Sequence, residues 1–142
     1  LGTMALLEKL DADLKKAMLA RDNVTRDTIR MLKSELLMLE NPDELAVLSR
    51  AVKSRRDSIQ SYIEGGRQDL ADKEQAEIEV IERYLPKQLD ASEAREAIAA
   101  IVQELGLSSP RELGQVMKEV KARYPGQIDG KTASSIAREL LS

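Results

Sequence analysis

Apolar side chains recur every three or four residues along most of this chain, and this spacing constrains the fold more than any other feature. Near the N-terminus the pattern is formed by Leu7, Leu10, Leu14, Ala17 and Met18. Residues three or four apart share one face of an α-helix, so the pattern predicts amphipathic helices that each bury one stripe. β-Branched and aromatic residues never gather in alternating runs, which argues against strands. We therefore expect an all-α protein.

The first part of the chain is expected to form a hairpin array or bundle of long helices. Asn23 is the predicted cap of the second helix, Pro42 separates the second from the third, Gly65-Gly66 ends the third and Pro86 closes the fourth. Connections this short make neighbouring helices antiparallel. The predicted helices cover residues 5–21, 23–40, 44–64 and 68–85.

The end of the second predicted helix is apolar on nearly all sides, because Leu36, Leu37, Met38 and Leu39 follow one another. A helix that is apolar all round is usually buried. We expect it to be a central helix of the bundle, and the alternative is a partly exposed interface for another subunit.

Three shorter helices are expected in the remainder, at residues 92–106, from Ser109, and from Asp129 to Leu141. Ser109 and Glu112 have the spacing of a capping box, with Pro110 at the first helical position. The segment Pro86–Asp90 is the predicted boundary. The expected division is an expression-tag remnant at residues 1–3, an N-terminal helical domain at 4–86 and a small tail domain at 87–142.

The composition removes most catalytic and metal-dependent chemistry. The 142-residue chain contains no His and no Cys, which are the commonest general base and the commonest metal ligands. Carboxylate pairs such as Glu77 with Glu79, or Glu93 with Glu96, lie on periodic polar faces, where charge usually serves solubility. No apolar run is long enough to span a membrane. We expect no catalytic residue, no metal, no cofactor, no membrane partner, a monomer and a cytoplasmic location.

One stretch is locally basic although the chain has a net charge of −3. Between Gly114 and Lys131 there are two acidic residues, Glu119 and Asp129, and four basic ones, Lys118, Lys121, Arg123 and Lys131. Such residues either form a solvated face around a core of Val116, Met117 and Val120, with Gly114 permitting close helix packing, or they contact nucleic-acid phosphates. Amides at the start of the last helix could bind one more phosphate unless Asp129 caps them. The candidate nucleic-acid-binding residues are Gly114, Gln115, Lys118, Lys121, Arg123, Gly130 and Lys131.

A second basic cluster lies on the third predicted helix and just after it. It consists of Arg50, Lys53, Arg55, Arg56 and Arg67. Lys53 and Asp57 have the i,i+4 spacing of a helix ion pair, so a salt-bridged surface is the favoured interpretation and phosphate binding the other. The near absence of aromatic residues weakens any case for stacking on single-stranded bases.

Several motifs together resemble the GatB/YqeY family, and the resemblance covers nearly the whole chain. They are Ile29-Arg30-Met31-Leu32-Lys33, Arg55-Arg56-Asp57-Ser58-Ile59, Gly65-Gly66-Arg67-Gln68-Asp69-Leu70-Ala71, Glu77-Ile78-Glu79-Val80-Ile81, Tyr84-Leu85-Pro86-Lys87-Gln88-Leu89 and Gly114-Gln115-Val116-Met117-Lys118 with the Pro125-Gly126 turn and Asp129-Gly130-Lys131. The last group is similar to the C-terminal tail of GatB, the tRNA-handling subunit of the glutamine-dependent aminoacyl-tRNA amidotransferase. The chain departs from the family at Glu40–Asp43, where relatives usually have a longer acidic connector.

The resemblance implies an all-helical fold in two parts, with a long-helix N-terminal part and a small tail domain associated with gripping tRNA. It links the chain to carbon–nitrogen ligase activity with glutamine as amido-N-donor, but the active-site residues of that reaction are not in this sequence. The expected function is therefore a non-catalytic tRNA-binding accessory, with amidotransferase or aminoacyl-tRNA synthetase components as protein partners. The alternative is a protein-interaction module that docks helices on its bundle face. RNA binding would weaken steeply with salt, whereas apolar docking would not.

Overall fold

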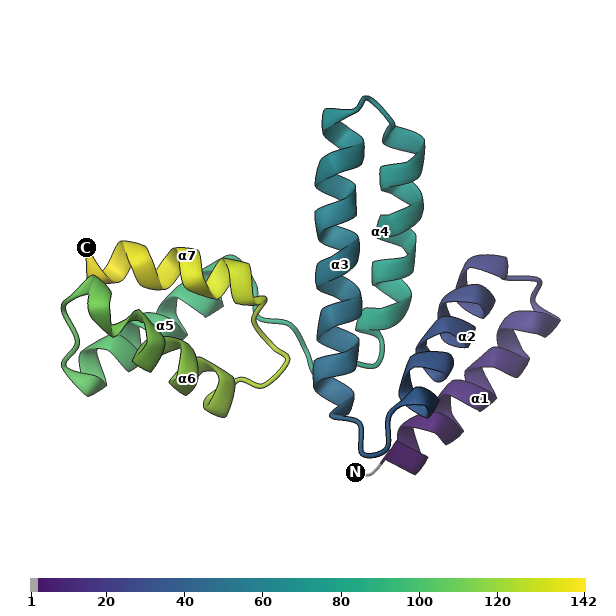
Figure 1. The fold of residues 1–142 in the computed structure, drawn as a ribbon, viewed down its shortest axis with the longest axis horizontal. Helices are drawn as coiled ribbons and strands as arrows, with labels where there is room; N and C mark the ends of the chain where they lie inside the picture. Colours follow the sequence, from purple (N-terminus) through teal and green to yellow (C-terminus); the bar gives the residue numbers. More distant parts are fainter. Residues whose placement is uncertain (1–2) are drawn as a thin grey trace. The chain divides into compact units, whose positions relative to one another are not determined.

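The computed structural model describes residues 3–142, without the side chains of Thr3 and Met4, and confirms the all-α fold class. The predicted tag remnant at 1–3 therefore lies largely outside the described residues. Within the described part the chain forms seven α-helices and one short 3-10 helix, with no strand (Figure 1). The helices are α1 (Thr3–Leu19), α2 (Asn23–Met38), α3 (Glu44–Glu64), α4 (Gln68–Glu82), α5 (Ala91–Leu105), the 3-10 helix η1 (Pro110–Glu112), α6 (Leu113–Arg123) and α7 (Gly130–Leu141).

The chain divides into two compact units, the first ending at Leu85 and the second beginning at Pro86. The first unit is built from two helical hairpins, α1 with α2 and α3 with α4, and α2 packs against α4 and α3 (Figure 1). Ile29, Leu32 and Leu36 lie along one stripe of α2 and are almost completely buried. They pack with residues of the other helices, chiefly Leu10, Val47, Leu48, Ala51, Val52, Ile78, Val80 and Ile81.

Helix α2 is central as expected, since it contacts α1, α3 and α4, but the apolar residues at its C-terminal end are exposed rather than buried. Leu36 is buried, but the side chains that follow it point outward, with Leu37 66% and Met38 83% exposed. The helix stops at Met38, and Leu39 already has extended backbone. The three neighbouring helices cover the side of α2 that carries Ile29, Leu32 and Leu36, and the apolar residues after Leu36 remain in solvent.

The turn between α1 and α2 also differs from the sequence prediction. Asp22, not Asn23, caps α2, because its carboxylate accepts hydrogen bonds from the Thr25 amide at 3.1 Å and the Thr25 hydroxyl at 2.6 Å. A capping side chain binds the amide two or three residues after it, and here the spacing from Asp22 to Thr25 is three. The bond from the Thr25 hydroxyl, and to a smaller extent the bond from its amide, lowers the pKa of Asp22.

Helix α1 ends two residues earlier than expected because Arg21 takes the left-handed conformation, with φ 55°. The Asp22 amide donates to the Ala17 carbonyl at 2.9 Å and the Arg21 amide to the Met18 carbonyl at 3.2 Å. This pair of bonds is the Schellman ending of a helix, in which the left-handed position is usually glycine. An arginine there is strained by its Cβ.

The second unit packs α5, α6 and α7 around its own core. The buried residues are Ala94, Ile98, Ile101, Val116, Val120, Ala133, Ile136, Ala137 and Leu141. The segment that enters the unit is held by the loop between α6 and α7. The Leu89 amide donates to the Gln127 carbonyl at 2.9 Å, and the Gln88 side-chain amide donates to the Gly126 carbonyl at 2.5 Å. Gly126 has φ 72°, so glycine suits the turn that presents this carbonyl.

Capping residues set the starts of the helices in the second unit. Asp90 and Glu93 form a reciprocal capping box on α5, and Ser109 and Glu112 form the one predicted from the sequence. The second box begins the 3-10 helix η1 rather than an α-helix, and α6 follows from Leu113. The rings of hydrogen bonds at these starts satisfy amides that would otherwise have no partner.

Replacing Arg21 by glycine is expected to stabilise the protein by about 0.5–1 kcal/mol, because glycine adopts the left-handed conformation without a Cβ clash. Urea denaturation followed by circular dichroism would measure the free energy of unfolding. The matched control is Ala20→Gly, one residue earlier, where φ is not positive. That substitution should destabilise by up to about 1 kcal/mol, and a loss of stability in Arg21→Gly would contradict the strain argument.

Tyr84→Phe should destabilise the first unit by about 1 kcal/mol, since the Tyr84 hydroxyl donates to the Asp13 carboxylate at 2.6 Å. Burial first, and then this bond, raises the pKa of Tyr84. An unfolded tyrosine ionises near pH 10, so the stabilisation is complete below that pH and declines above it. The stability difference between wild type and variant should therefore shrink above about pH 10; a difference that grows there would contradict the argument.

Candidate nucleic-acid interface

Helix α6 carries an exposed cationic face opposite its buried one. Lys118 and Lys121 lie one turn apart with Gly114 and Gln115 on the same side, and all four are exposed. Val116 and Val120 form the buried side. Neither lysine makes an ion pair with the residues that the structure describes. We call Gly114, Gln115, Lys118 and Lys121 the α6 ridge.

Of the two expectations for packing on α6, the one for Met117 is met and the one for Gly114 is not. Met117 is partly buried and packs against the core of the second unit, as expected. Gly114 does not serve close helix packing, because a Cβ placed on it would meet no atom within 4 Å. Its lack of a side chain therefore leaves backbone accessible beside the two lysines.

Arg123 is separated from the ridge by its ion pairs. Its guanidinium contacts Glu104 of α5 at 2.6 Å and Glu119 of its own helix at 2.7 Å. The hydrogen bonds to Glu104 and Glu119, in that order, raise the pKa of Arg123. Two residues beyond Lys121, Arg123 lies about 200° further round the helix, so the structure does not bring it together with the lysines.

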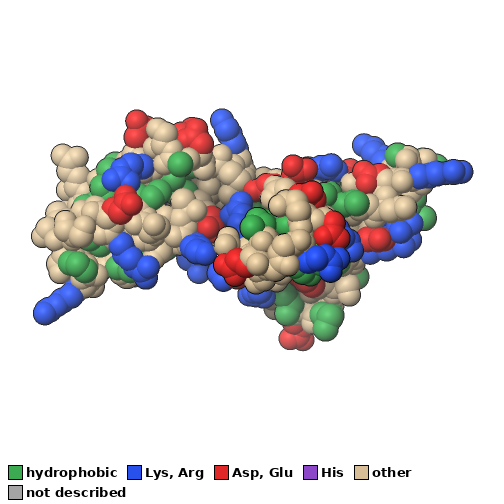
Figure 2. Space-filling model, turned by 90° about the horizontal axis from the view of Figure 1, so that it is seen from above, with side chains coloured by type: hydrophobic (Ala, Val, Ile, Leu, Met, Phe, Trp, Pro, Cys, Tyr) green, Lys and Arg blue, Asp and Glu red, His purple; other side chains and the backbone are tan. Residues whose placement is uncertain are grey.

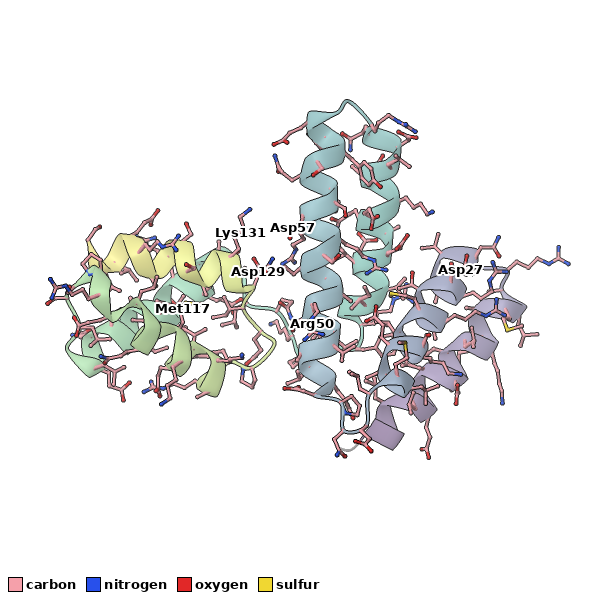
Figure 3. All side chains as sticks on the ribbon, viewed as in Figure 1. Asp27, Arg50, Asp57, Met117, Asp129 and Lys131 are labelled. Atoms are coloured by element: carbon pink, nitrogen blue, oxygen red, sulfur yellow. The ribbon has the colours of Figure 1, made fainter. Side chains whose placement is uncertain are left out.

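The start of α7 is closed to an anion by its own cap. Asp129 accepts hydrogen bonds from the Thr132 amide and the Thr132 hydroxyl, each at 3.2 Å. Its carboxylate therefore occupies the position that a phosphate would take near Gly130. Asp129 and Lys131 are labelled at this helix start in Figure 3.

Lys131 belongs to a groove between α5 and α7. The groove has a volume of about 680 Å³. Arg95 crosses it to contact Glu139 at 2.6 Å, while Lys131 makes no ion pair within the described part of the chain. We call it the α5–α7 groove. Its lining is Ala91, Ser92, Arg95, Lys131, Thr132, Ser135, Ile136 and Glu139.

The centre of the second basic cluster is structural. The Arg55 side chain is 14% exposed and contacts Glu77 at 3.0 Å and Glu74 at 3.8 Å. It also donates to the Ala51 carbonyl at 3.0 Å and reaches Sδ of Met31 at 3.3 Å. Arg55 therefore ties α3 to α4 and α2, and its charge is neutralised.

The other members of that cluster form surface ion pairs, with one exception. Lys53 contacts Asp57 at 3.2 Å, Arg56 contacts Glu82 at 3.4 Å and Arg67 contacts Asp69 at 3.0 Å. This is the salt-bridged surface favoured by the i,i+4 spacing. Arg50 makes no ion pair among the described residues, and Figure 3 labels it on α3 below Asp57.

Sequence reasoning missed a notch between α2 and α3. It measures about 380 Å³ and is lined by Glu35, Met38, Leu39, Val47, Arg50, Ala51, Ser54 and Arg55. We call it the α2–α3 notch. The signal in the sequence was the apolar run before Pro42, because a helix that ends in three apolar residues and a short connector cannot turn all of them inward.

In the part of the chain that the structure describes, no three acidic residues are grouped to hold a metal ion. None of the described helices is both long and apolar enough to cross a bilayer.

Comparisons with known proteins identify relatives along nearly the whole chain. A family profile described as Yqey-like protein matches residues 7–141. The chain is similar to "Altered inheritance of mitochondria protein 41, mitochondrial" of Lachancea thermotolerans, with 36% identity over 121 residues, covering 78% of this chain and 63% of that protein. The protein of the same name from Kluyveromyces lactis is 35% identical over 132 residues, covering 87% and 69%. That of Saccharomyces cerevisiae strain YJM789 is 31% identical over 137 residues, covering 90% and 72%.

These names overturn the expected location. The relatives are named as mitochondrial proteins, so the prediction of a cytoplasmic protein was wrong. The prediction was a default drawn from the lack of an apolar run long enough to span a membrane, and that observation does not distinguish the two compartments. The chain spans 63% of the length of the first of these relatives.

Arg55→Ala should destabilise the first unit by about 1–3 kcal/mol, since it removes the cation from the partly buried Glu77 and the donor from the Ala51 carbonyl. Arg50→Ala is the matched control on the same helix and should change the free energy of unfolding by less than about 0.5 kcal/mol. Urea denaturation of both variants gives the comparison. Equal effects would mean that the Arg55 contacts do not stabilise the fold.

Proposed function

Because this chain belongs to the Yqey-like protein family, we propose that it is a non-catalytic accessory protein that binds RNA through its second unit, with tRNA as the first candidate. The observation that carries the proposal is the α6 ridge, where Lys118 and Lys121 are exposed and unpaired on a chain of net charge −3. Mitochondria contain tRNA as well as the cytoplasm does, so the corrected location is compatible with this function.

The contact is to the phosphate backbone. Lysine ammonium groups bind phosphate oxygens as point charges and release counterions, and the two ridge lysines are spaced by one helical turn. The chain has three Tyr and no Trp or Phe, so stacking on bases contributes little. Exposed backbone at Gly114 and the amide of Gln115 supply neutral hydrogen-bonding groups beside the charges.

The α5–α7 groove provides a second contact of the same kind. Lys131 brings an unpaired cation, and the hydroxyls of Ser92 and Ser135 line the same groove. Hydroxyl groups commonly bind phosphate and sugar oxygens in protein–nucleic acid complexes. Arg123 and Gly130 fall out of the proposed contact, because Arg123 is held by two carboxylates and the amides near Gly130 are capped.

The candidate pathway is tRNA-dependent amidation, and it derives from the resemblance of the second unit to the tail of GatB. In that setting the chain would hold or present tRNA, and the carbon–nitrogen ligase chemistry would belong to a partner. Amidotransferase or aminoacyl-tRNA synthetase components are the proposed protein partners.

A second candidate function is docking of a partner helix on the first unit. The exposed side chains of Leu37 and Met38 beside the α2–α3 notch favour it, since apolar groups exposed together often mark protein contacts. Apolar docking would be nearly independent of salt, in contrast to phosphate binding.

The RNA proposal is tested by fluorescence anisotropy of labelled total tRNA at two salt concentrations. The double variant Lys118→Glu/Lys121→Glu should bind at least about tenfold more weakly at low salt. The slope of log affinity against log salt should become shallower by about 1.4–1.8 for two lost phosphate contacts. The matched control is Lys53→Glu/Arg67→Glu, which makes the same change of charge on cations that are already paired.

Equal losses in the two double variants would show a response to net charge alone and would contradict a specific ridge. Absence of binding by the wild type at low salt would eliminate the RNA function for the isolated protein and leave helix docking as the candidate. Circular dichroism on every variant checks that the helices are intact.

A further inference from the structure

The turn that joins α1 to α2 exposes apolar side chains at the end of a helical hairpin. Leu19 is 87% exposed, Met18 51% and Val24 39%. These three residues lie within one short stretch of chain, between the last turn of α1 and the first turn of α2. We call residues 15–24 the hairpin tip.

Unpaired cations surround this apolar group. Lys15, Lys16 and Arg21 are exposed and make no ion pair among the described residues. The carboxylate of Asp22 is occupied as the cap of α2. In Figure 2 Lys and Arg side chains project from the end of the view where this hairpin lies, with hydrophobic and acidic atoms beside them. The tip therefore combines an apolar point with a positive collar.

Arg21, one of these cations, has a backbone conformation that arginine rarely adopts. Its φ of 55° lies where glycine is the usual residue, and the Schellman bonds around it fix the conformation. A side chain kept in a strained backbone position is a reason to look for a function of that side chain. The sequence supplies an arginine where glycine would make a more stable turn.

We propose that the hairpin tip binds an anionic lipid surface. Leu19 and Met18 enter the boundary between headgroups and acyl chains, while Lys15, Lys16 and Arg21 contact the lipid phosphates. The contact is peripheral, because none of the described helices could cross a bilayer. It departs from the expectation, formed from the sequence, that the protein has no membrane partner.

The combination of cations and aliphatic side chains at the tip favours an anionic lipid surface over RNA. RNA would use the cations but gains nothing from exposed aliphatic side chains, and no aromatic residue lies in the tip for stacking. The chain provides a contrast at the other end of the same hairpin, where Leu37 and Met38 are also exposed but have Glu35 and Glu40 close to them in the sequence. Of the residues lining the adjoining notch, Arg50 is the one cation without a partner in the described part of the chain, so this patch should attract anionic lipid less than the hairpin tip does.

Co-sedimentation with phosphatidylcholine vesicles, with and without phosphatidylglycerol, tests the proposal on the full chain. The wild type should bind the anionic vesicles more than the neutral ones, and less at high salt. Leu19→Ser should lower the partition coefficient several-fold, whereas the matched control Leu37→Ser should leave it unchanged. Arg21→Gly should lower it about fivefold, the effect expected for one cation at an anionic surface.

The Arg21→Gly variant separates binding from folding, because it is expected to be at least as stable as the wild type. Weaker vesicle binding by this more stable protein would support a role for the arginine at the surface. Equal binding to neutral and anionic vesicles, or equal losses in Leu19→Ser and Leu37→Ser, would overturn the proposal. So would loss of tRNA binding in Arg21→Gly without any vesicle binding by the wild type, since the tip would then be an RNA contact.

Discussion

The first unit depends on the way that α3 holds α4 and α2, and Arg55 is the residue at which these contacts meet. Its guanidinium lies against Glu77 of α4 and reaches the sulfur of Met31 on α2. A partly buried cation requires nearby carboxylates and carbonyls, so its position fixes the register of the helices that supply them. Helix α1 contacts the other helices of this unit mainly through α2 and through the hydrogen bond from Tyr84 to Asp13. The C-terminal turn of α1 is therefore left exposed to solvent.

The second unit achieves its packing differently, with three short helices and a loop that holds the entering segment. Hydrogen bonds from Gln88 and Leu89 to the carbonyls of Gly126 and Gln127 substitute for apolar contact that a unit of this size lacks. Helices α5 and α7 bury small residues such as Ala94, Ala133 and Ala137, so their backbones approach closely. Helix α6 packs through Val116 and Val120, with Leu113 and Met117 partly buried beside them, which leaves the opposite face open for lysines.

Local chemistry made much of the fold predictable, and non-local packing explains what was missed. The all-α class followed from periodicity, and the cap formed by Ser109 and Glu112 was visible as a motif. The cap of α2 was misassigned because Asp22 and Asn23 are both good caps, and only the fold shows that the Asp22 carboxylate accepts the hydrogen bonds from Thr25. Exposure of Leu37 and Met38 could not be read from sequence, since it depends on which side of α2 faces α3 and α4. For the same reason, sequence grouped Arg123 with Lys118 although a carboxylate of α5 neutralises it.

The distribution of paired and unpaired cations is the property that connects the fold to function. Arg55, Arg56, Lys53 and Arg67 have carboxylate partners and add little to the field of the surface, whatever their number in the sequence. The hairpin tip, the α6 ridge and Lys131 lack such partners, so their fields extend into solvent and attract anions even on a chain with excess acidic residues. In the functions proposed above, the surroundings of each cationic group determine which anion it binds. Aliphatic side chains at the tip match a lipid surface, whereas open backbone and hydroxyls around the lysines of the second unit match a sugar-phosphate chain.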